Sequence, residues 1–246
     1  MATTKRSESI STADGDYDGL LVVPEHPNGA GILLLQEIFG VSEFIRDRAL
    51  ALGEEGYVVL CPDVFWRVER NVDCPHDDEG LKRAFGVAQR FAEIDPAITA
   101  ADLTAALDHL KRVPEVSGLV AVLGYCLGGR LAYELAVAGD PACCVSYYGS
   151  GIAAQLDSAH KISCPLLFHF GGKDPYIPAA EVDQIREAFA GRGDVEFDVQ
   201  EDAGHAFENS FSAQFSNPEA TAKSWPITVA WLARCLIGDQ RRSAGT

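Results

Sequence analysis

The chain has 246 residues, of which 47% are hydrophobic and 23% charged, a balance typical of a globular protein with a sizeable core. Its formal net charge of −16 argues against nucleic acid as a partner, because phosphate binding needs clustered Lys and Arg. No apolar run approaches the roughly 20 residues that span a bilayer, and the first eight residues lack the apolar stretch of a secretory signal. We therefore expect a cytoplasmic protein without a membrane partner.

Short β-rich runs alternate with amphipathic stretches along the chain, a pattern typical of a parallel sheet covered by helices. The first half predicts strands at 19–23, 30–36 and 57–61, and helices at 43–55, 79–94 and 96–112. The second half predicts strands at 119–125, 143–148, 165–170 and 195–200, and helices at 127–138, 179–190 and 218–236.

No linker with a change of composition interrupts this alternation. We predict a single α/β domain over residues 1–246, with a mainly parallel twisted sheet, helices on both faces, and frayed polar ends at 1–7 and 238–246. In the last helix, Trp225, Val229 and Leu232 are expected to share one apolar stripe.

The seven cysteines are an odd number, with no CxxC pair and no histidine at zinc-finger spacing. This pattern indicates reduced thiols rather than a disulfide framework or a metal site.

One cysteine lies where a buried strand passes into a helix. Residues 124–128 read Gly-Tyr-Cys-Leu-Gly, which is the nucleophile-elbow pattern with Cys126 in place of serine. The tight turn needs small flanking residues, and it directs the Leu127 N–H and the helix N-terminus at the same point, which favours a thiolate and a developing oxyanion. The alternative is a buried free cysteine in a packing turn.

A catalytic thiol needs a base and a residue that orients the base. In α/β-hydrolases the order along the chain is nucleophile, acid, histidine, each following a strand. Asp174 follows the strand at 165–170, and His205 follows the strand at 195–200. Each could separately be an ordinary turn or loop residue, but both stand in the required order. His169 lies inside a strand and is expected to pack in the core.

The loop after the strand at 30–36 reads Glu37-Ile38-Phe39-Gly40. In this fold that loop supplies the second oxyanion N–H, which would be that of Ile38. Glu37 would then be a carboxylate close to the nucleophile, or alternatively a capping or salt-bridging residue.

The chain resembles the dienelactone hydrolase family from about residue 20 to 235. The resemblance is carried by six segments, at 36–41, 61–63, 124–129, 147–149, 171–174 and 203–207. It implies an α/β-hydrolase that acts on small lactones or activated esters without metal or cofactor, as a monomer or small homo-oligomer. It also implies that Glu37 hydrogen-bonds the resting thiol and takes its proton when substrate binds, which would protect Cys126 from oxidation.

The sequence departs from the family where dienelactone's carboxylate is held by two arginines. One position corresponds to Lys82, with Arg83 beside it, and the other to Asn209, preceded by Glu208. A lysine cannot make the bidentate contact of a guanidinium, so these candidate substrate-binding residues leave the substrate open.

The interpretation is a cysteine-dependent hydrolase that forms a thioester acyl-enzyme. One alternative is a general carboxylesterase or thioesterase of the same fold with another substrate. Two alternatives of a different class are a thiol redox sensor and a non-catalytic binding protein.

Overall fold

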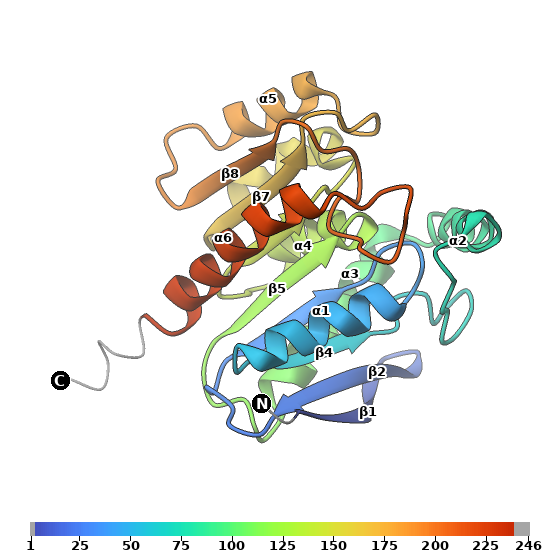
Figure 1. Cartoon of the computed structure of the whole chain (residues 1–246). Helices are drawn as coiled ribbons and strands as arrows, with labels where there is room; N and C mark the ends of the chain where they lie inside the picture. The colour runs from blue at the N-terminus through green and yellow to red at the C-terminus, as the bar shows by residue number, and fades with distance from the viewer. Residues whose placement is uncertain (1–2, 239–246) are drawn as a thin grey trace. The chain divides into compact units, whose positions relative to one another are not determined.

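The computed structural model describes residues 3–238, and the chain separates into two compact units, Met1–Val120 and Ala121–Thr246. In the first unit, strands lie in the order β1 (Thr3–Thr12), β2 (Gly15–Pro24), β4 (Val58–Pro62) and β3 (Gly31–Leu35). β2 pairs antiparallel with β1 and β4, whereas β3 and β4 are parallel. Helix α1 (Glu43–Glu54) covers one face of these strands and α3 (Pro96–Lys111) the other, with α2 (Asp78–Phe91) between β4 and α3 in the chain (Figure 1).

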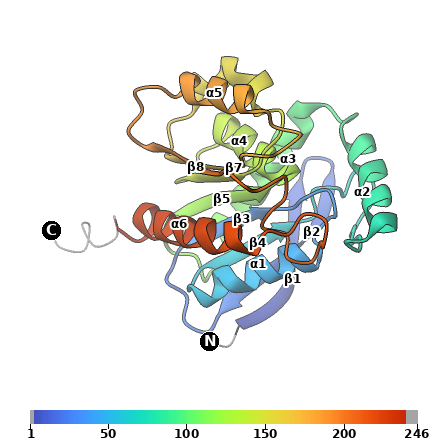
Figure 2. The ribbon, with the colours of Figure 1, turned by 45° about the horizontal axis from the view of Figure 1, so that its top comes forward.

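In the second unit, neighbouring strands are all parallel and follow chain order: β5 (Val120–Tyr125), β6 (Cys144–Tyr147), β7 (Leu166–Gly171) and β8 (Val195–Gln200). Helices α4 (Leu127–Ala138) and α5 (Ala179–Ala188) lie on one face and α6 (Pro218–Leu236) on the other (Figure 2). A 3-10 segment, η1 (Ile152–Lys161), packs against α4 and α5. β5, β6 and β7 are buried along their whole length, as expected of parallel strands covered on both faces.

Side chains at the helix starts explain several boundaries. The Asp77 carboxylate accepts the Gly80 N–H at the start of α2, and the Asp95 carboxylate accepts the Ala97 N–H at the start of α3. The Asn217 side chain accepts the Ala220 N–H at the start of α6. Each cap satisfies a backbone donor that has no partner within the helix.

The α/β fold with a mainly parallel sheet and helices on both faces is confirmed, and twelve of its elements begin and end within a few residues of the predicted bounds. The predicted fraying of residues 3–7 is wrong, because they belong to β1. β1 has a polar sequence in which only Ile10 is buried, so it lacks the apolar alternation of a strand. β1 is held in place by a hairpin with β2, in which pairing is continuous from Thr3, opposite Pro24, to Thr12, opposite Gly15.

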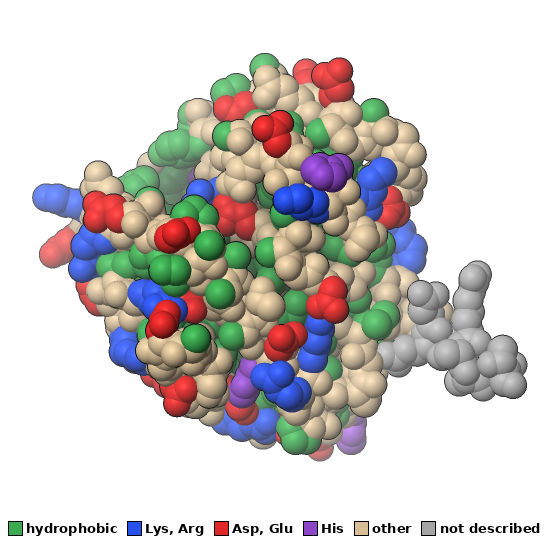
Figure 3. All heavy atoms as spheres, turned by 180° about the vertical axis from the view of Figure 1, so that it is seen from behind, with side chains coloured by type: hydrophobic (Ala, Val, Ile, Leu, Met, Phe, Trp, Pro, Cys, Tyr) green, Lys and Arg blue, Asp and Glu red, His purple; other side chains and the backbone are tan. Residues whose placement is uncertain are grey.

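The fraying predicted for 1–2 and 239–246 lies outside the described residues, and the single-domain organisation stays a prediction. Among residues 3–238, no helix is long and apolar enough to cross a membrane. On the face shown in Figure 3, acidic side chains lie among basic and apolar ones rather than in one large patch.

The buried stripe of α6 differs from the predicted one. Leu232 is fully buried as predicted, whereas Trp225 and Val229 are only half-buried. The other buried positions include the hydroxyl residues Ser224 and Thr228. They face inward because each hydroxyl meets a buried polar partner: Ser224 donates to the Glu208 carboxylate, and Thr228 bonds other side chains of the core. A pattern read from hydrophobicity alone misses such positions.

Thr228 belongs to a buried row of hydrogen bonds. His169 lies fully buried in β7, as predicted, with Nδ1 2.8 Å from Asp198 Oδ2 and Nε2 2.8 Å from Thr228 Oγ1. Thr228 Oγ1 is also 2.6 Å from the Tyr147 hydroxyl. The Asp198 carboxylate can only accept, so a neutral His169 donates from Nδ1 and accepts the Thr228 proton at Nε2. Tyr147 then donates to Thr228.

Acidification should destabilise the protein through this row. Burial lowers the pKa of His169 despite its hydrogen bond to Asp198. Burial raises the pKa of Asp198, but hydrogen bonds from His169 and Gln200 outweigh it and lower that pKa. Below about pH 6.5 His169 binds a proton in the unfolded chain but not in the folded one. The free energy of unfolding therefore decreases as the pH is lowered.

Urea unfolding at pH 7.5, 6.0 and 5.0 measures this loss. His205 contributes with the opposite sign over the same range, because its pKa is raised in the folded protein. The quantity to compare is therefore the free energy of unfolding of the wild type minus that of His169→Gln, which should fall as the pH is lowered from 7.5 to 5.0. A difference that stays constant across that range would contradict the assignment.

Candidate active site

Cys126 occupies the sharp turn between β5 and α4, with φ of 55° and ψ of −115°. This conformation is rare for residues other than glycine and is worth about 1–3 kcal/mol of strain. Two close approaches of backbone require glycines nearby. A Cβ on Gly124 would lie 2.0 Å from the Gly128 oxygen, and one on Gly129 would lie 2.5 Å from the Tyr147 oxygen. The same Tyr147 oxygen accepts the Cys126 N–H at 3.0 Å, which ties the turn to β6.

The structure brings Cys126, His205 and Asp174 into one hydrogen-bonded row. His205 Nε2 is 3.0 Å from Cys126 Sγ, and His205 Nδ1 is 2.7 Å from Asp174 Oδ2. The other carboxylate oxygen of Asp174 accepts the Tyr176 N–H at 2.8 Å. With both oxygens engaged, Asp174 orients the imidazole so that Nε2 faces the sulfur.

Opposing effects act on His205. Burial by itself lowers its pKa, but the charge of a Cys126 thiolate and the hydrogen bonds to Asp174 and Cys126 outweigh burial and raise the pKa to about 10. The row therefore favours a charged imidazole at His205, held between the Cys126 sulfur and the Asp174 carboxylate. Leu127 is the first residue of α4, so its N–H has no hydrogen-bond acceptor within the helix. It points out of the helix N-terminus, at the Cys126 turn.

Two tyrosines that were given no role from the sequence pack against the histidine. The Tyr148 ring centre is 5.3 Å from that of His205, and the Tyr176 ring meets His205 edge-on at 5.0 Å. Tyr148 has a φ of 39°, and Tyr176 is 53% exposed. The available signal was position: Tyr148 directly follows β6 and Tyr176 lies in the loop after β7, at the strand ends where functional side chains gather.

The loop that carries His205 is anchored to α6. The Phe207 carbonyl accepts the Asn217 N–H at 2.9 Å and the Thr221 hydroxyl at 3.2 Å, and Glu208 accepts the Ser224 hydroxyl. Asn209 is fully buried in this loop, and its Oδ1 accepts the Phe211 N–H at 3.1 Å. Its amide oxygen therefore bonds the loop's own backbone, and the substrate-binding role of Asn209 stays a prediction.

The remaining candidates lie in the first unit. Glu37 and Ile38 follow β3, and Glu37 is 1% exposed. The Gly40 N–H donates to the Glu37 carbonyl at 3.3 Å, which closes a tight turn. Lys82 and Arg83 are exposed on α2. Arg83 contacts the Glu69 carboxylate at 2.6 Å, so its guanidinium already has an anionic partner.

All seven cysteines are free thiols. Among residues 3–238, no group of three or more His, Cys, Asp or Glu side chains is arranged to hold a metal ion.

Residues 17–236 match the dienelactone hydrolase family. The carboxymethylenebutenolidase of Pseudomonas sp. (strain P51) is 37% identical over 89% of this chain and 91% of its own. The carboxymethylenebutenolidase of Pseudomonas putida is 34% identical over 84% of this chain and 87% of its own. A solved structure from Klebsiella pneumoniae subsp. pneumoniae, provisionally assigned as a dienelactone hydrolase, superimposes with a TM-score of 0.80 at 26% identity, covering 95% of this chain and all of that one.

The architecture is that of an α/β-hydrolase. The chain belongs to the dienelactone hydrolase family and is a dienelactone hydrolase-like hydrolase, which confirms the family predicted from its sequence segments.

The pKa of His205 should depend on Cys126. Cys126→Ala removes the thiolate charge and one hydrogen bond, so burial should dominate and the His205 pKa should fall from about 10 toward or below its ordinary value. NMR titration of the ring protons measures the change, with Cys61→Ala, a substitution in the first unit, as the control. An unchanged His205 titration in Cys126→Ala would show that the sulfur is not its charge partner.

Proposed function

We propose that this protein hydrolyses small lactones or activated carboxylic esters through a thioester on Cys126. The observation that carries the proposal is the hydrogen-bonded row from Cys126 through His205 to Asp174, placed on a strand-to-helix turn. The family and its carboxymethylenebutenolidase relatives support the same class of substrate.

In the proposed first step, Cys126 Sγ attacks the carbonyl carbon and the carbonyl π electrons move to oxygen. The N–H groups of Leu127 and Ile38 would hold that oxyanion. Collapse of the tetrahedral intermediate breaks the carbon–oxygen bond of the ester, and His205 gives the leaving oxygen its proton. The product is a thioester between the acyl group and Cys126.

In the second step, His205 takes a proton from water, and the resulting hydroxide attacks the thioester carbonyl. Collapse expels the Cys126 thiolate and releases the carboxylic acid. Asp174 holds the imidazole in place and stabilises its charged form throughout. A thiolate leaves the first intermediate easily, so leaving groups such as enolates and phenolates suit this nucleophile best.

Glu37 is proposed to hold the resting thiol, to take up its proton when substrate binds, as the family resemblance implies, and to return that proton to the Cys126 thiolate after the acid leaves. Its near-complete burial in the turn after β3 supports a carboxylate that is kept from bulk solvent. We further propose that the protein acts without metal or cofactor, as a monomer or small homo-oligomer.

Cys126 should be the thiol on which turnover depends. Cys126→Ala should abolish hydrolysis of p-nitrophenyl acetate, and His205→Ala should lower kcat by about 10²- to 10⁴-fold, the usual contribution of a general base. Asp174→Asn should cost less than His205→Ala, because Asp174 moves no proton.

Cys61→Ala and Cys143→Ala are the controls, since both thiols are fully buried and their loss should change stability more than rate. Full activity in Cys126→Ala would refute the mechanism. Stoichiometric oxidation of the wild-type enzyme without ester turnover would favour a thiol redox sensor instead.

The enzyme should prefer neutral esters to dienelactone. No guanidinium stands at position 209, Asn209 is buried, and Arg83 is already paired with Glu69. Losing a charge-assisted hydrogen bond to the substrate carboxylate costs about 1.5–3 kcal/mol, or roughly 10- to 150-fold in kcat/KM.

The comparison is kcat/KM for cis- and trans-dienelactone against p-nitrophenyl acetate and butyrate at two salt concentrations. Asn209→Ala serves as a control, because a buried amide should affect stability rather than substrate preference. A hundredfold preference for dienelactone would mean that another cation anchors the carboxylate.

A further inference from the structure

The segment Gln36–Gly40 is held in place by the loop at 63–74, which follows β4. The Val64 N–H donates to the Gln36 side-chain oxygen at 3.2 Å, and the Cys74 N–H donates to the Phe39 carbonyl at 2.9 Å. Gly40 packs so closely that an added Cβ would lie 1.8 Å from the Val72 oxygen. The position of residues 36–40 therefore follows that of the loop.

The loop is shaped from within by one buried carboxylate. Asp63 Oδ1 accepts the Phe65 N–H at 3.2 Å, and Oδ2 accepts the Asn71 N–H at 2.7 Å, which folds the intervening residues into a compact turn. Asn71 adopts a φ of 55° at the far end of this turn. These bonds fix the shape of the loop but do not attach it to the rest of the unit.

Three side chains attach the loop to α3, and we name them the Asp102 clamp: Trp66 and Arg67 of the loop and Asp102 of α3. Elsewhere on the loop, Asp73 binds Arg46 of α1, and Glu69 binds Arg83 and Arg90 of α2. Arg67 donates to the Asp102 carboxylate from Nε at 2.7 Å and from Nη2 at 2.9 Å. The Trp66 Nε1–H donates to the same carboxylate at 2.9 Å. Asp102 is only 8% exposed, so these contacts are partly shielded from water and stronger than a surface ion pair.

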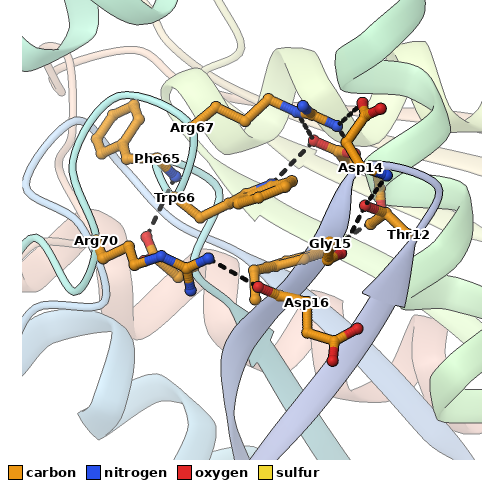
Figure 4. A network of polar contacts seen from close by, with 11 residues as sticks. Thr12, Asp14, Gly15, Asp16, Phe65, Trp66, Arg67 and Arg70 are labelled. Carbon is orange, nitrogen blue, oxygen red and sulfur yellow. Dashed lines mark hydrogen bonds and ion pairs between the residues drawn. The ribbon is translucent and has the colours of Figure 1, made fainter.

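Three further contacts join the loop to the β1–β2 hairpin. Arg67 also reaches Asp14 at 2.8 Å, and Arg70 donates to the Asp16 carbonyl at 2.8 Å; Figure 4 shows both arginines beside Trp66 at the hairpin turn. The Tyr17 ring stacks on Trp66 at 5.2 Å with an angle of 7° between the planes. α3 and the hairpin thus hold the part of the loop that carries Trp66, Arg67 and Arg70.

We infer that Asp102 is a positioning residue for the Gln36–Gly40 segment, acting through Trp66, Arg67 and the 63–74 loop. The inference rests on the proposed function for its consequence, since that segment carries Glu37 and the Ile38 N–H. In this proposal Asp102 makes no contact with the substrate. Its effect on turnover would come from the placement of an oxyanion donor, where a displacement of about 1 Å can cost up to about 100-fold.

Asp102→Asn tests this inference, because it keeps the shape of the side chain while removing the charge and one acceptor. Trp66→Phe is a second variant, which keeps an aromatic ring at this position but removes the N–H donor together with part of the indole ring. The matched control is Glu115→Gln, which breaks the two-point contact between Arg6 of β1 and Glu115, at 2.7 and 3.1 Å, in the same unit but away from the loop.

Hydrogen exchange followed by mass spectrometry gives a readout that needs no activity. In Asp102→Asn, peptides covering 36–42 and 63–76 should exchange faster than in the wild type, whereas in Glu115→Gln they should not. With p-nitrophenyl acetate, kcat should fall about 10- to 100-fold in Asp102→Asn with KM changed little, and Glu115→Gln should keep the wild-type kcat. Alkylation of Cys126 by iodoacetamide reports that the nucleophile itself is intact in each variant.

Wild-type exchange at 36–42 in both Asp102→Asn and Trp66→Phe would overturn the inference. An equal loss of kcat in Asp102→Asn and Glu115→Gln would also overturn it, because the effect would then be one of general stability. An enzyme that hydrolyses no ester at all would instead refute the proposed function, and the exchange measurement would still decide whether Asp102 positions the segment.

Discussion

The candidate site depends on the close approach of backbone around Cys126. β5, the first turn of α4 and the end of β6 come so near to one another that Gly124 and Gly129 have no room for a Cβ. The Tyr147 carbonyl both limits Gly129 and accepts the Cys126 N–H, so the unusual conformation of Cys126 is maintained by packing from two sides. Strain of this kind persists only where the surroundings over-determine it, and here it presents a thiol at the end of the parallel strands.

A layer of buried polar groups stands behind that turn. Tyr147 supplies a backbone oxygen to Cys126 and a ring that stacks on His169 at 4.1 Å, while its hydroxyl meets Thr228 of α6. Buried polar groups without partners are costly, but a fully connected row fixes one arrangement of the core. The same helix anchors the loop that carries His205 through Thr221 and Ser224, so α6 supports both the Cys126 turn and the His205 loop.

The pKa values of the two histidines in the second unit are set by a competition between burial and charge. Desolvation disfavours a charged imidazole, and in His169 burial prevails, so that ring stays neutral beside Asp198. In His205 a second potential anion, the Cys126 thiolate, adds to Asp174 and reverses the outcome. Two buried histidines in one unit, each bonded to an aspartate, thus differ in pKa because only one of them also faces a sulfur.

The sequence by itself determined the alternating strands and helices, the Cys126 turn, and the order in which Asp174 and His205 follow. These features are local: apolar periodicity, glycine at close approaches, and polar residues directly after strands are set by near neighbours in the chain. The family resemblance was equally accessible, because it rests on short contiguous segments spread over most of the chain.

Only the tertiary structure decided which polar residues face inward and what they bind. β1 is ordered by its pairing with β2 although its own sequence is polar, and Ser224 and Thr228 join the apolar residues on the buried face of α6 because their partners come from other elements. Asp102 binds Trp66 and Arg67, which lie more than thirty positions earlier in the chain. A hydrogen bond or ion pair between distant residues depends on where the backbone brings them, and no local periodicity records that position.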